Sequence, residues 1–279
     1  MPLVPGLIRC PIYSSRESAD CKISHPMPRY DFRSPRVYVD SALGPSTSVV
    51  LDAAQAHYLR DVLRLRSSDA VLVFNGRDGE WRARIASAGE RKLVLELMEL
   101  TRQQTTALDL HYLFAPLKHA RLDYLIQKAV EMGASRLQPV MTRHGQVARV
   151  NLERMRANAI EAAEQCGILT LPQIDPLRRL EEVIAARDPA RVLVFCDEDA
   201  EVKDPIAALS QARVGDRNVP APMAVLVGPE GGFAVEERAA LTQLPNTVRL
   251  SLGPRILRAD TAAVAALALV GAVLGDWHC

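Results

Sequence analysis

Between residues 37 and 100, short segments alternate apolar and polar positions with a period of two, which is typical of half-buried β-strands. The alternation at residues 37–39 predicts one strand, and the apolar run 71–74 predicts another. The second run leads through the turn Asn75–Gly79 into alternating residues 81–85, which predicts a hairpin. With a further strand over residues 92–100, this segment predicts a small β-barrel-like unit.

A helix is predicted inside this β-rich segment, over residues 53–65. On that helix His57, Arg60 and Arg64 stand at positions i, i+3 and i+7, and would share one face. A basic helix face is most often solvated, and a surface that binds a phosphate backbone is the alternative. The residues alone leave both interpretations open.

From about Ala107 the pattern changes to short apolar runs that alternate with longer amphipathic segments. This pattern predicts an α/β layer around a mainly parallel sheet, whose strands are covered on both faces. Helices are predicted over residues 121–132, where apolar positions form one stripe, and 151–166. The strands are predicted at His111–Ala115, Leu137–Met141, Val192–Cys196, Ala224–Val227 and Val248–Leu252.

The change of pattern predicts a domain boundary near residues 101–106. We therefore expect a β-rich domain over residues 27–104 and an α/β domain over residues 105–279. Residues 1–26 follow neither a period of two nor one of 3.6, and are predicted to be a poorly ordered tail. Met27 is a candidate for the native start.

Composition narrows the class of protein. With 279 residues, 48% hydrophobic and 24% charged, the chain is typical of globular proteins and long enough for two domains. Lys and Arg total 34 against 33 Asp and Glu, so any contact with a phosphate backbone must come from locally clustered arginines. The five cysteines show no zinc-like spacing, which favours a reducing cytosol and predicts no metal.

The N-terminus lacks the basic n-region of a signal peptide, so export is not expected. The longest apolar run, residues 262–275, falls short of the roughly 20 residues that span a bilayer. It is predicted to be a buried terminal helix. We expect a cytoplasmic protein without a membrane partner.

Four common motifs are absent from the sequence: GxxxxGK[ST], GxGxxG, GxSxG and HExxH. Two glycine loops stand out instead, GPEGGF over residues 228–233 and GPRILRADT over residues 253–261. Each loop follows a predicted buried strand and precedes a predicted helix, and in open α/β sheets such loops bind ligands. Two structural Gly-Pro turns are the alternative.

GPEGG followed about twenty residues later by LGPRILRADTAA resembles the paired signature of the ribosomal RNA uracil-N3 methyltransferases, members of the SPOUT superfamily. Both halves stand in the family's order. Three further stretches are similar: Lys118 with residues 123–133, residues 161–167 with 171–172, and residues 57–65. The resemblance covers the chain from about residue 30 to its end.

This resemblance implies a PUA-like β-barrel domain that binds RNA, then a SPOUT α/β domain with a trefoil knot, an exception to the usual topology rules. It also implies that the knot loops hold S-adenosylmethionine largely through backbone groups. The family's reaction would be methylation of N3 of a uridine in 16S ribosomal RNA, free or in the small ribosomal subunit, by a cytoplasmic homodimer.

The resemblance also suggests site residues. Arg258 is the catalytic candidate, because its charge would stabilise the uridine anion. A structural salt bridge from Arg258 to a carboxylate such as Glu230 is the alternative. Arg60, Arg64 and Arg143 are the candidates for RNA binding. The cofactor-binding candidates are Leu226, Val227, Gly228, Glu230, Gly231, Leu250, Leu252, Gly253, Ile256 and Leu257. The apolar members could equally belong to the core.

Two positions depart from the family pattern: Asp260 stands where Glu is usual, and Ile168 where Arg is frequent. Any bridge made by Asp260 must therefore shift, and an RNA or dimer contact at Ile168 is in doubt. Three alternatives stay open. They are a SPOUT enzyme for another RNA such as transfer RNA, a non-catalytic RNA-binding protein, and an unrelated α/β protein with structural Gly-Pro turns.

Overall fold

The structure is a computed structural model that describes residues 31, 33–67, 69–88, 92–118, 120–212 and 220–277. The described residues form two compact units, which divide between Gln103 and Gln104. The proposed tail over residues 1–26 lies outside the described residues. No helix within the described ranges is long and apolar enough to cross a membrane.

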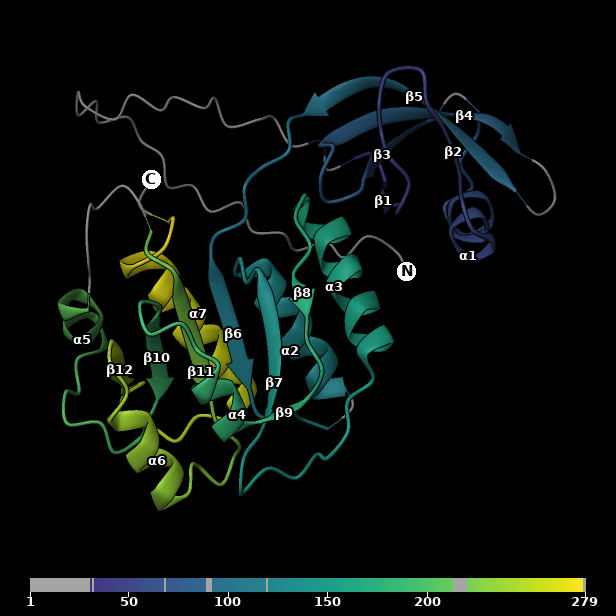
Figure 1. Ribbon diagram of the computed structural model, residues 1–279. Coiled ribbons are helices and arrows are strands. Elements are labelled where there is room, and N and C mark those ends of the chain that lie inside the picture. The colour runs from purple at the N-terminus through teal and green to yellow at the C-terminus, as the bar shows by residue number, and fades with distance from the viewer. Residues whose placement is uncertain are drawn as a thin grey trace, which may run out of the picture. The chain divides into compact units, whose positions relative to one another are not determined.

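The first unit is a curled five-stranded sheet with the order β1-β3-β4-β5-β2 (Figure 1). β1 pairs in parallel with β3, and the other neighbours are antiparallel. The predicted hairpin is formed by β3 and β4. The bounds are β1 Arg36–Tyr38, β2 Ser48–Val50, β3 Ala70–Phe74, β4 Glu80–Ala88 and β5 Leu93–Arg102.

A buried ion cluster joins strands β1, β4 and β5 of this sheet. Glu80 accepts hydrogen bonds from Arg36 Nε at 2.7 Å and from Arg102 Nη2 at 2.6 Å, and all three residues are buried. Burial alone would raise the pKa of Glu80. The two guanidiniums together lower this pKa by more than burial raises it, so the net shift is downward. The carboxylate is therefore ionised, with its charge compensated inside the unit.

The helix predicted over residues 53–65 is wrong in its second half. The α-helix α1 covers only Ala53–His57, and a π-helical turn, η1, follows at Tyr58–Val62. The wide turn buries Leu59 in the core, where Leu63 and Leu65 also pack. Because the 3.6-residue repeat is lost and Arg64 has φ +56°, Arg60 and Arg64 do not share a regular helix face.

The second unit is built on a parallel sheet with the order β12-β10-β11-β6-β7-β8, and β9 pairs with the end of β7. Every pairing in it is parallel. The bounds are β6 Leu110–Phe114, β7 Arg136–Met141, β8 Gln173–Ile174, β9 Arg178–Arg179, β10 Val192–Cys196, β11 Met223–Val227 and β12 Thr247–Leu250. The mainly parallel α/β layer is thus confirmed.

Helices cover both faces of this sheet (Figure 1). One face carries the long helices α2 (Ala120–Glu131), α3 (Leu152–Cys166) and α7 (Ala259–Val273). The other face carries the short helices α4 (Leu180–Ala185) and α6 (Val235–Thr242), while α5 (Pro205–Gln211) packs against α7 and β12. The trefoil knot stays a prediction.

Candidate active site

The carboxyl ends of the parallel strands bring the two glycine loops to one edge of the sheet. Residues 228–234 follow β11 and residues 251–258 follow β12, with β10 between these strands. The order of the sheet also reverses at β6, because β7 lies on one side of it and β11 on the other. Ligands of open α/β sheets bind at such reversal points, so this edge is the candidate site.

Packing explains Gly228 and Gly231 in the loop after β11. A Cβ on Gly228 would lie 2.8 Å from the ring of Phe233, which is buried and meets Phe195 edge-on at a centroid distance of 6.0 Å. A Cβ on Gly231 would lie 3.3 Å from His144 Cβ. His144 Nδ1 also lies 3.1 Å from Gly231 O, so the loop after β7 supports this loop.

Backbone conformation, in contrast, explains the glycine of the loop after β12. Gly253 has φ +95°, and no atom lies within 4 Å of the position of a Cβ. Leu252 and Leu257 are partly exposed, and Ile256 is fully exposed at 103%. This loop therefore presents open backbone and apolar side chains together.

The other apolar candidates belong to the core through their side chains. Leu226 and Leu250 are fully buried and Val227 is 4% exposed. These three residues therefore reach a ligand only through their backbone groups.

Arg121, in the first turn of α2, links the two glycine loops. Its Nη1 donates to Glu230 Oε1 at 2.5 Å, and its Nε donates to Asp260 Oδ2 at 3.0 Å. The hydrogen bond from Arg121 holds the pKa of Asp260 below its ordinary value. The shorter carboxylate of Asp260 thus takes part in a bridge.

Arg121 was missed as a functional residue by the sequence analysis. One signal was available, because a basic side chain in the first turn of a helix opposes the helix dipole unless carboxylates compensate it. Its buried Nη2 atom has no hydrogen-bond partner among the described residues. The Nη2 atom of Arg121 can therefore donate a hydrogen bond to another group.

Arg258 lies at the N-cap of α7, at the end of the second glycine loop. Its Nε is 4.0 Å from Asp260 Oδ1, and its side chain is 66% exposed. Glu230, the carboxylate of the first loop that a structural salt bridge with Arg258 would use, contacts Arg121 instead. The Arg258 guanidinium is therefore only loosely held and is accessible to a substrate.

The loop after β7 places Arg143 beside the first glycine loop. Arg143 N donates to Glu237 Oε1 at 2.8 Å, and the other oxygen of this buried carboxylate accepts from Ala234 N at 2.9 Å. Glu237 thereby joins this loop to the start of α6. The Arg143 side chain is 70% exposed, with Glu236 3.8 Å away.

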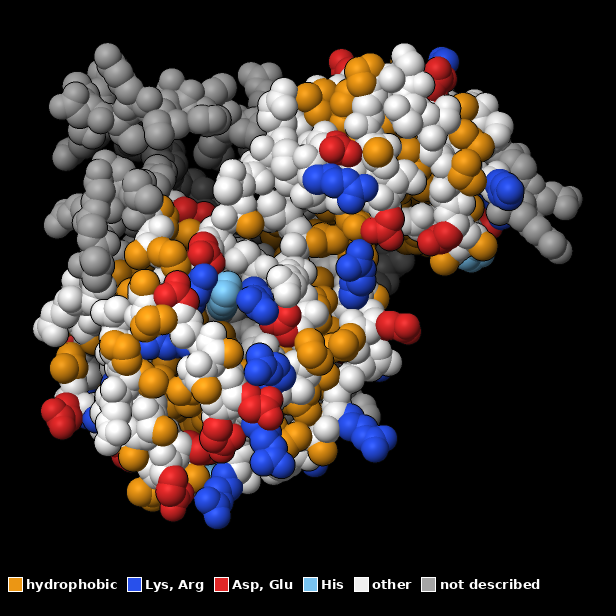
Figure 2. Space-filling view, viewed as in Figure 1, with side chains coloured by type: hydrophobic (Ala, Val, Ile, Leu, Met, Phe, Trp, Pro, Cys, Tyr) orange, Lys and Arg blue, Asp and Glu red, His pale blue; other side chains and the backbone are white. Residues whose placement is uncertain are grey.

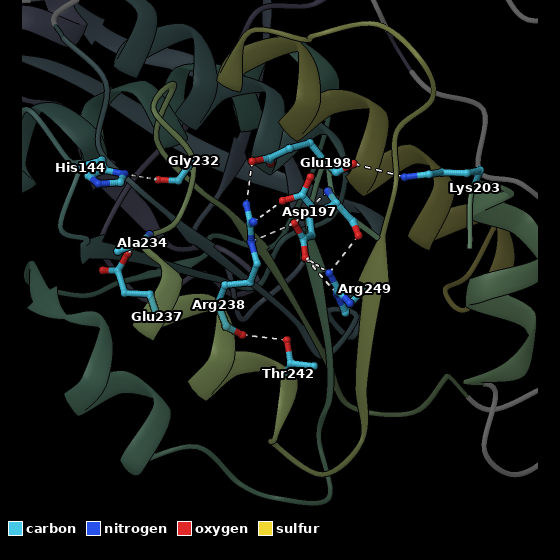
Figure 3. A network of polar contacts seen from close by, with 11 residues as sticks. His144, Asp197, Glu198, Lys203, Gly232, Ala234, Glu237, Arg238, Thr242 and Arg249 are labelled. Atoms are coloured by element: carbon cyan, nitrogen blue, oxygen red, sulfur yellow. Dashed lines mark hydrogen bonds and ion pairs between the residues drawn. The ribbon is translucent and has the colours of Figure 1, made fainter. Parts of the chain in front are cut away.

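The loop after β10, between the glycine loops, was also missed by the sequence analysis. Figure 3 shows its polar contacts: the buried Asp197 accepts from Arg249 Nε at 2.9 Å, and Arg238 Nη2 donates to Glu198 at 2.8 Å. Asp199 also contacts Arg238. The three carboxylates converge, but guanidiniums engage each of them, which makes this cluster a brace for the loops.

Arg60 and Arg64 belong to the first unit. Arg60 Nη2 pairs with Asp61 at 2.9 Å, and Arg64 is exposed.

At the carboxyl edge of the second unit, desolvation raises the pKa of Cys196 to about 12, so its thiol is neutral at pH 7 and unsuited to act as a nucleophile.

Comparisons with known proteins define the class first. Residues 104–271 match the model of an RNA methyltransferase domain, and residues 51–98 match that of an RNA methyltransferase PUA domain. The PUA-like first unit and the SPOUT-type α/β second unit therefore make the chain an RNA methyltransferase with a PUA domain.

Individual relatives specify the family. The chain is 33% identical to ribosomal RNA small subunit methyltransferase E of Rickettsia conorii, with coverage of 88% of this chain and 97% of that protein. The Synechocystis protein of the same name is 32% identical, with coverage of 81% and 74%. The chain belongs to the ribosomal RNA small subunit methyltransferase E family.

A solved structure of this family agrees with the fold. Ribosomal RNA small subunit methyltransferase E from Neisseria gonorrhoeae, bound to S-adenosyl methionine, superposes with a TM-score of 0.74 and 26% sequence identity. The match covers 88% of this chain and 99% of that one.

Proposed function

We propose that this protein transfers the methyl group of S-adenosylmethionine to N3 of a uridine in 16S ribosomal RNA. The observation that carries the proposal is the meeting of the two glycine loops, bridged by Arg121, at the carboxyl edge of the parallel sheet. Family membership supports both the methyl donor and the ribosomal RNA substrate.

The residues of the site fit this cofactor. The backbone at Gly253 is open, the exposed Ile256 and partly exposed Leu252 and Leu257 suit an adenine ring, and Arg121 Nη2 keeps an unused donor. Gly228 and Gly231 maintain the shape of the first loop, while Glu230 holds Arg121. Leu226, Val227 and Leu250 contribute backbone groups. When bound, S-adenosylmethionine supplies an activated methyl group on a sulfonium.

The reaction asks for little acid–base machinery from the protein, because the sulfonium is already a good leaving group. The enzyme must orient N3 of the uridine towards the methyl group and favour the loss of the N3 proton. Arg258 serves this step, since a guanidinium that stays protonated stabilises negative charge on the uracil ring. Its exposed side chain is free to meet the base.

In this proposal, basic residues of both units bind the RNA. Arg60 and Arg64 of the PUA-like unit and Arg143 of the α/β unit contact the phosphate backbone, for which guanidiniums are suited. Arg64 and Arg143 are exposed, whereas Arg60 is partly exposed and pairs with Asp61. We further propose that the enzyme acts as a homodimer in the cytoplasm, on the free RNA or on the small ribosomal subunit.

Product analysis tests the proposal. Small ribosomal subunits and free 16S RNA from cells that lack the protein are incubated with the purified enzyme and S-adenosylmethionine, and the nucleosides are analysed by mass spectrometry. We expect 3-methyluridine in one of the two samples. A different methylated nucleoside, or methylation of transfer RNA instead, would assign another substrate, and no incorporation into any RNA would overturn the enzymatic function.

A further inference from the structure

A hollow lies on the sheet face that carries α4 and α6, towards the amino ends of the strands. Its volume is about 270 Å³, near the lower end of small-molecule sites. The glycine loops follow the opposite, carboxyl ends. Four residues in register form one row of its floor, one from each of four neighbouring strands: Arg136, His111, Ala224 and Leu193.

Apolar side chains of the sheet and of the covering helix line part of the hollow. Ala224 is the smallest side chain of the row and stands between His111 and Leu193. The covering helix α4 has only six residues and contributes Val183 and Ile184 to the lining. A short helix over an alanine leaves room that a larger side chain would fill.

Four arginines line this hollow, and three of them are paired with carboxylates. Arg136 Nε lies 2.5 Å from Asp175, Arg191 Nη1 lies 2.7 Å from Asp109, and Arg178 Nε lies 3.5 Å from Glu182. Figure 2 shows basic side chains beside apolar ones over this face of the second unit. These three charges are compensated by the protein itself.

Arg187 is the fourth arginine, and its contacts are different. Its Nη1 donates to Arg191 O at 2.5 Å and its Nη2 donates to Pro245 O at 2.7 Å. Among the described residues no carboxylate lies within ion-pair distance of it, and Asp188, which also lines the hollow, accepts from Ala190 N. Burial lowers the pKa of Arg187, although the charge of Asp188 acts in the opposite direction.

His111, which lies next to Arg136 in the floor row, adds no charge to the hollow. Burial and the neighbouring Arg191 lower the pKa of His111 to about 4, so the imidazole is neutral at pH 7. Its Nε2 lies 3.4 Å from Asp109, which is itself paired with Arg191. Within the part of the chain that the structure describes, the hollow thus combines apolar side chains with Arg187, a guanidinium that has no carboxylate within ion-pair distance.

We propose that this hollow binds a small monocarboxylate with an apolar body, whose carboxylate pairs with Arg187 and whose body packs over Ala224. A guanidinium has five N–H donors, and the two carbonyl contacts of Arg187 leave donors for a carboxylate. A phosphate monoester, with a charge of about −1.5 to −2, would exceed the charge of Arg187. The site is separate from the methyl-transfer site.

The test uses the full chain with ¹³C-labelled Ile, Leu and Val methyl groups and two probes of equal shape, 4-phenylbutyrate and its uncharged amide. We expect 4-phenylbutyrate to shift the methyl resonances of Val183, Ile184 and Leu193. The amide should bind about tenfold more weakly, because it lacks the charge-assisted pair. Arg187→Gln should weaken binding of the acid by a similar factor and leave binding of the amide unchanged.

Arg178→Gln is the matched control, because it removes an arginine of the lining that already has a carboxylate partner. It should leave the affinity for 4-phenylbutyrate unchanged. Ala224→Leu should abolish binding of both probes by filling the hollow, and the two arginine variants decide the question if that variant does not fold. Equal affinity for the acid and the amide, equal losses in the two arginine variants, or no methyl shifts at this face would each overturn the proposal.

Discussion

Arg258 combines a position at the second glycine loop with an exposed side chain and only a 4.0 Å contact to Asp260. A residue that braced the loops would be held more tightly, as Arg121 is by Glu230 and Asp260. The two arginines therefore have different proposed tasks. Arg258 meets the substrate, and Arg121 keeps the loops together.

Replacing Arg258 should separate catalysis from cofactor binding. In Arg258→Ala we expect kcat to fall by roughly 10²–10³, the usual effect of removing one preorganised donor at a developing negative charge. Affinity for S-adenosylmethionine, measured by calorimetry, should change little, because the side chain points into solvent. Near-normal kcat in a folded variant that binds the cofactor would exclude the catalytic role.

The bridge of Arg121 should make a pH-dependent contribution to stability. The pKa of Asp260 lies below its ordinary value of 3.8 because Arg121 donates to it. The stabilisation that the ionised Asp260 gives is therefore fully present above the pKa that this group has in the unfolded chain. It is lost as the pH falls through the pKa that Asp260 has in the folded protein. We expect Arg121→Gln to lower the free energy of unfolding by about 1 kcal/mol at pH 7, as for partly exposed pairs.

Urea unfolding at several pH values checks this prediction. The difference in free energy of unfolding between Arg121→Gln and the wild type should stay constant down to about pH 4, because an aspartate in the unfolded chain has the ordinary pKa of 3.8. Below about pH 4 this difference should shrink. A difference that grows as the pH falls would contradict the bridge.

At the scale of elements, hydrophobic patterning predicted the strands of the parallel sheet because buried strands are continuous apolar runs. β10 has the predicted bounds, and β6, β7 and β11 each begin one residue earlier than expected. Short elements such as α4, with six residues, escaped prediction because they span too few turns to show a period. The π-turn at η1 was missed because core packing overrides the helical repeat there.

The loop after β12 offers a prediction with a matched control. Gly253 and Gly133 both have strongly positive φ, +95° and +85°, and neither has an atom within 4 Å of a Cβ position. Alanine at either position therefore brings the same backbone strain, roughly 1–3 kcal/mol.

Only Gly253→Ala should affect the cofactor. We expect its affinity for S-adenosylmethionine to fall at least about tenfold, which corresponds to 1.4 kcal/mol. Gly133→Ala, at the end of α2, should lose similar thermal stability and keep its affinity. Calorimetry and thermal unfolding of both variants provide the measurement, and undiminished affinity in Gly253→Ala would remove this loop from the cofactor site.

At the scale of the whole molecule, the fold class could be predicted from the sequence, because the hydrophobic pattern of the β-rich segment differs in period from that of the α/β segment. It also identified the two glycine loops, since each follows a buried strand. It could not show that the loop at Asp197 lies between them, because strand order depends on pairing between distant segments. The bridge of Arg121 to Glu230 and Asp260 was missed for the same reason: its partners are 109 and 139 residues away.

Primer extension on small-subunit ribosomal RNA tests the central claim most directly, because a methyl group on N3 blocks the Watson–Crick edge of uridine. RNA is compared from wild-type cells, from a strain without this protein, and from that strain complemented with the wild type or with Arg258→Ala. We predict a reverse-transcriptase stop at one uridine in the wild-type and complemented strains, absent from the deletion strain and strongly reduced with Arg258→Ala. An identical stop pattern in wild-type and deletion strains would contradict the proposed function.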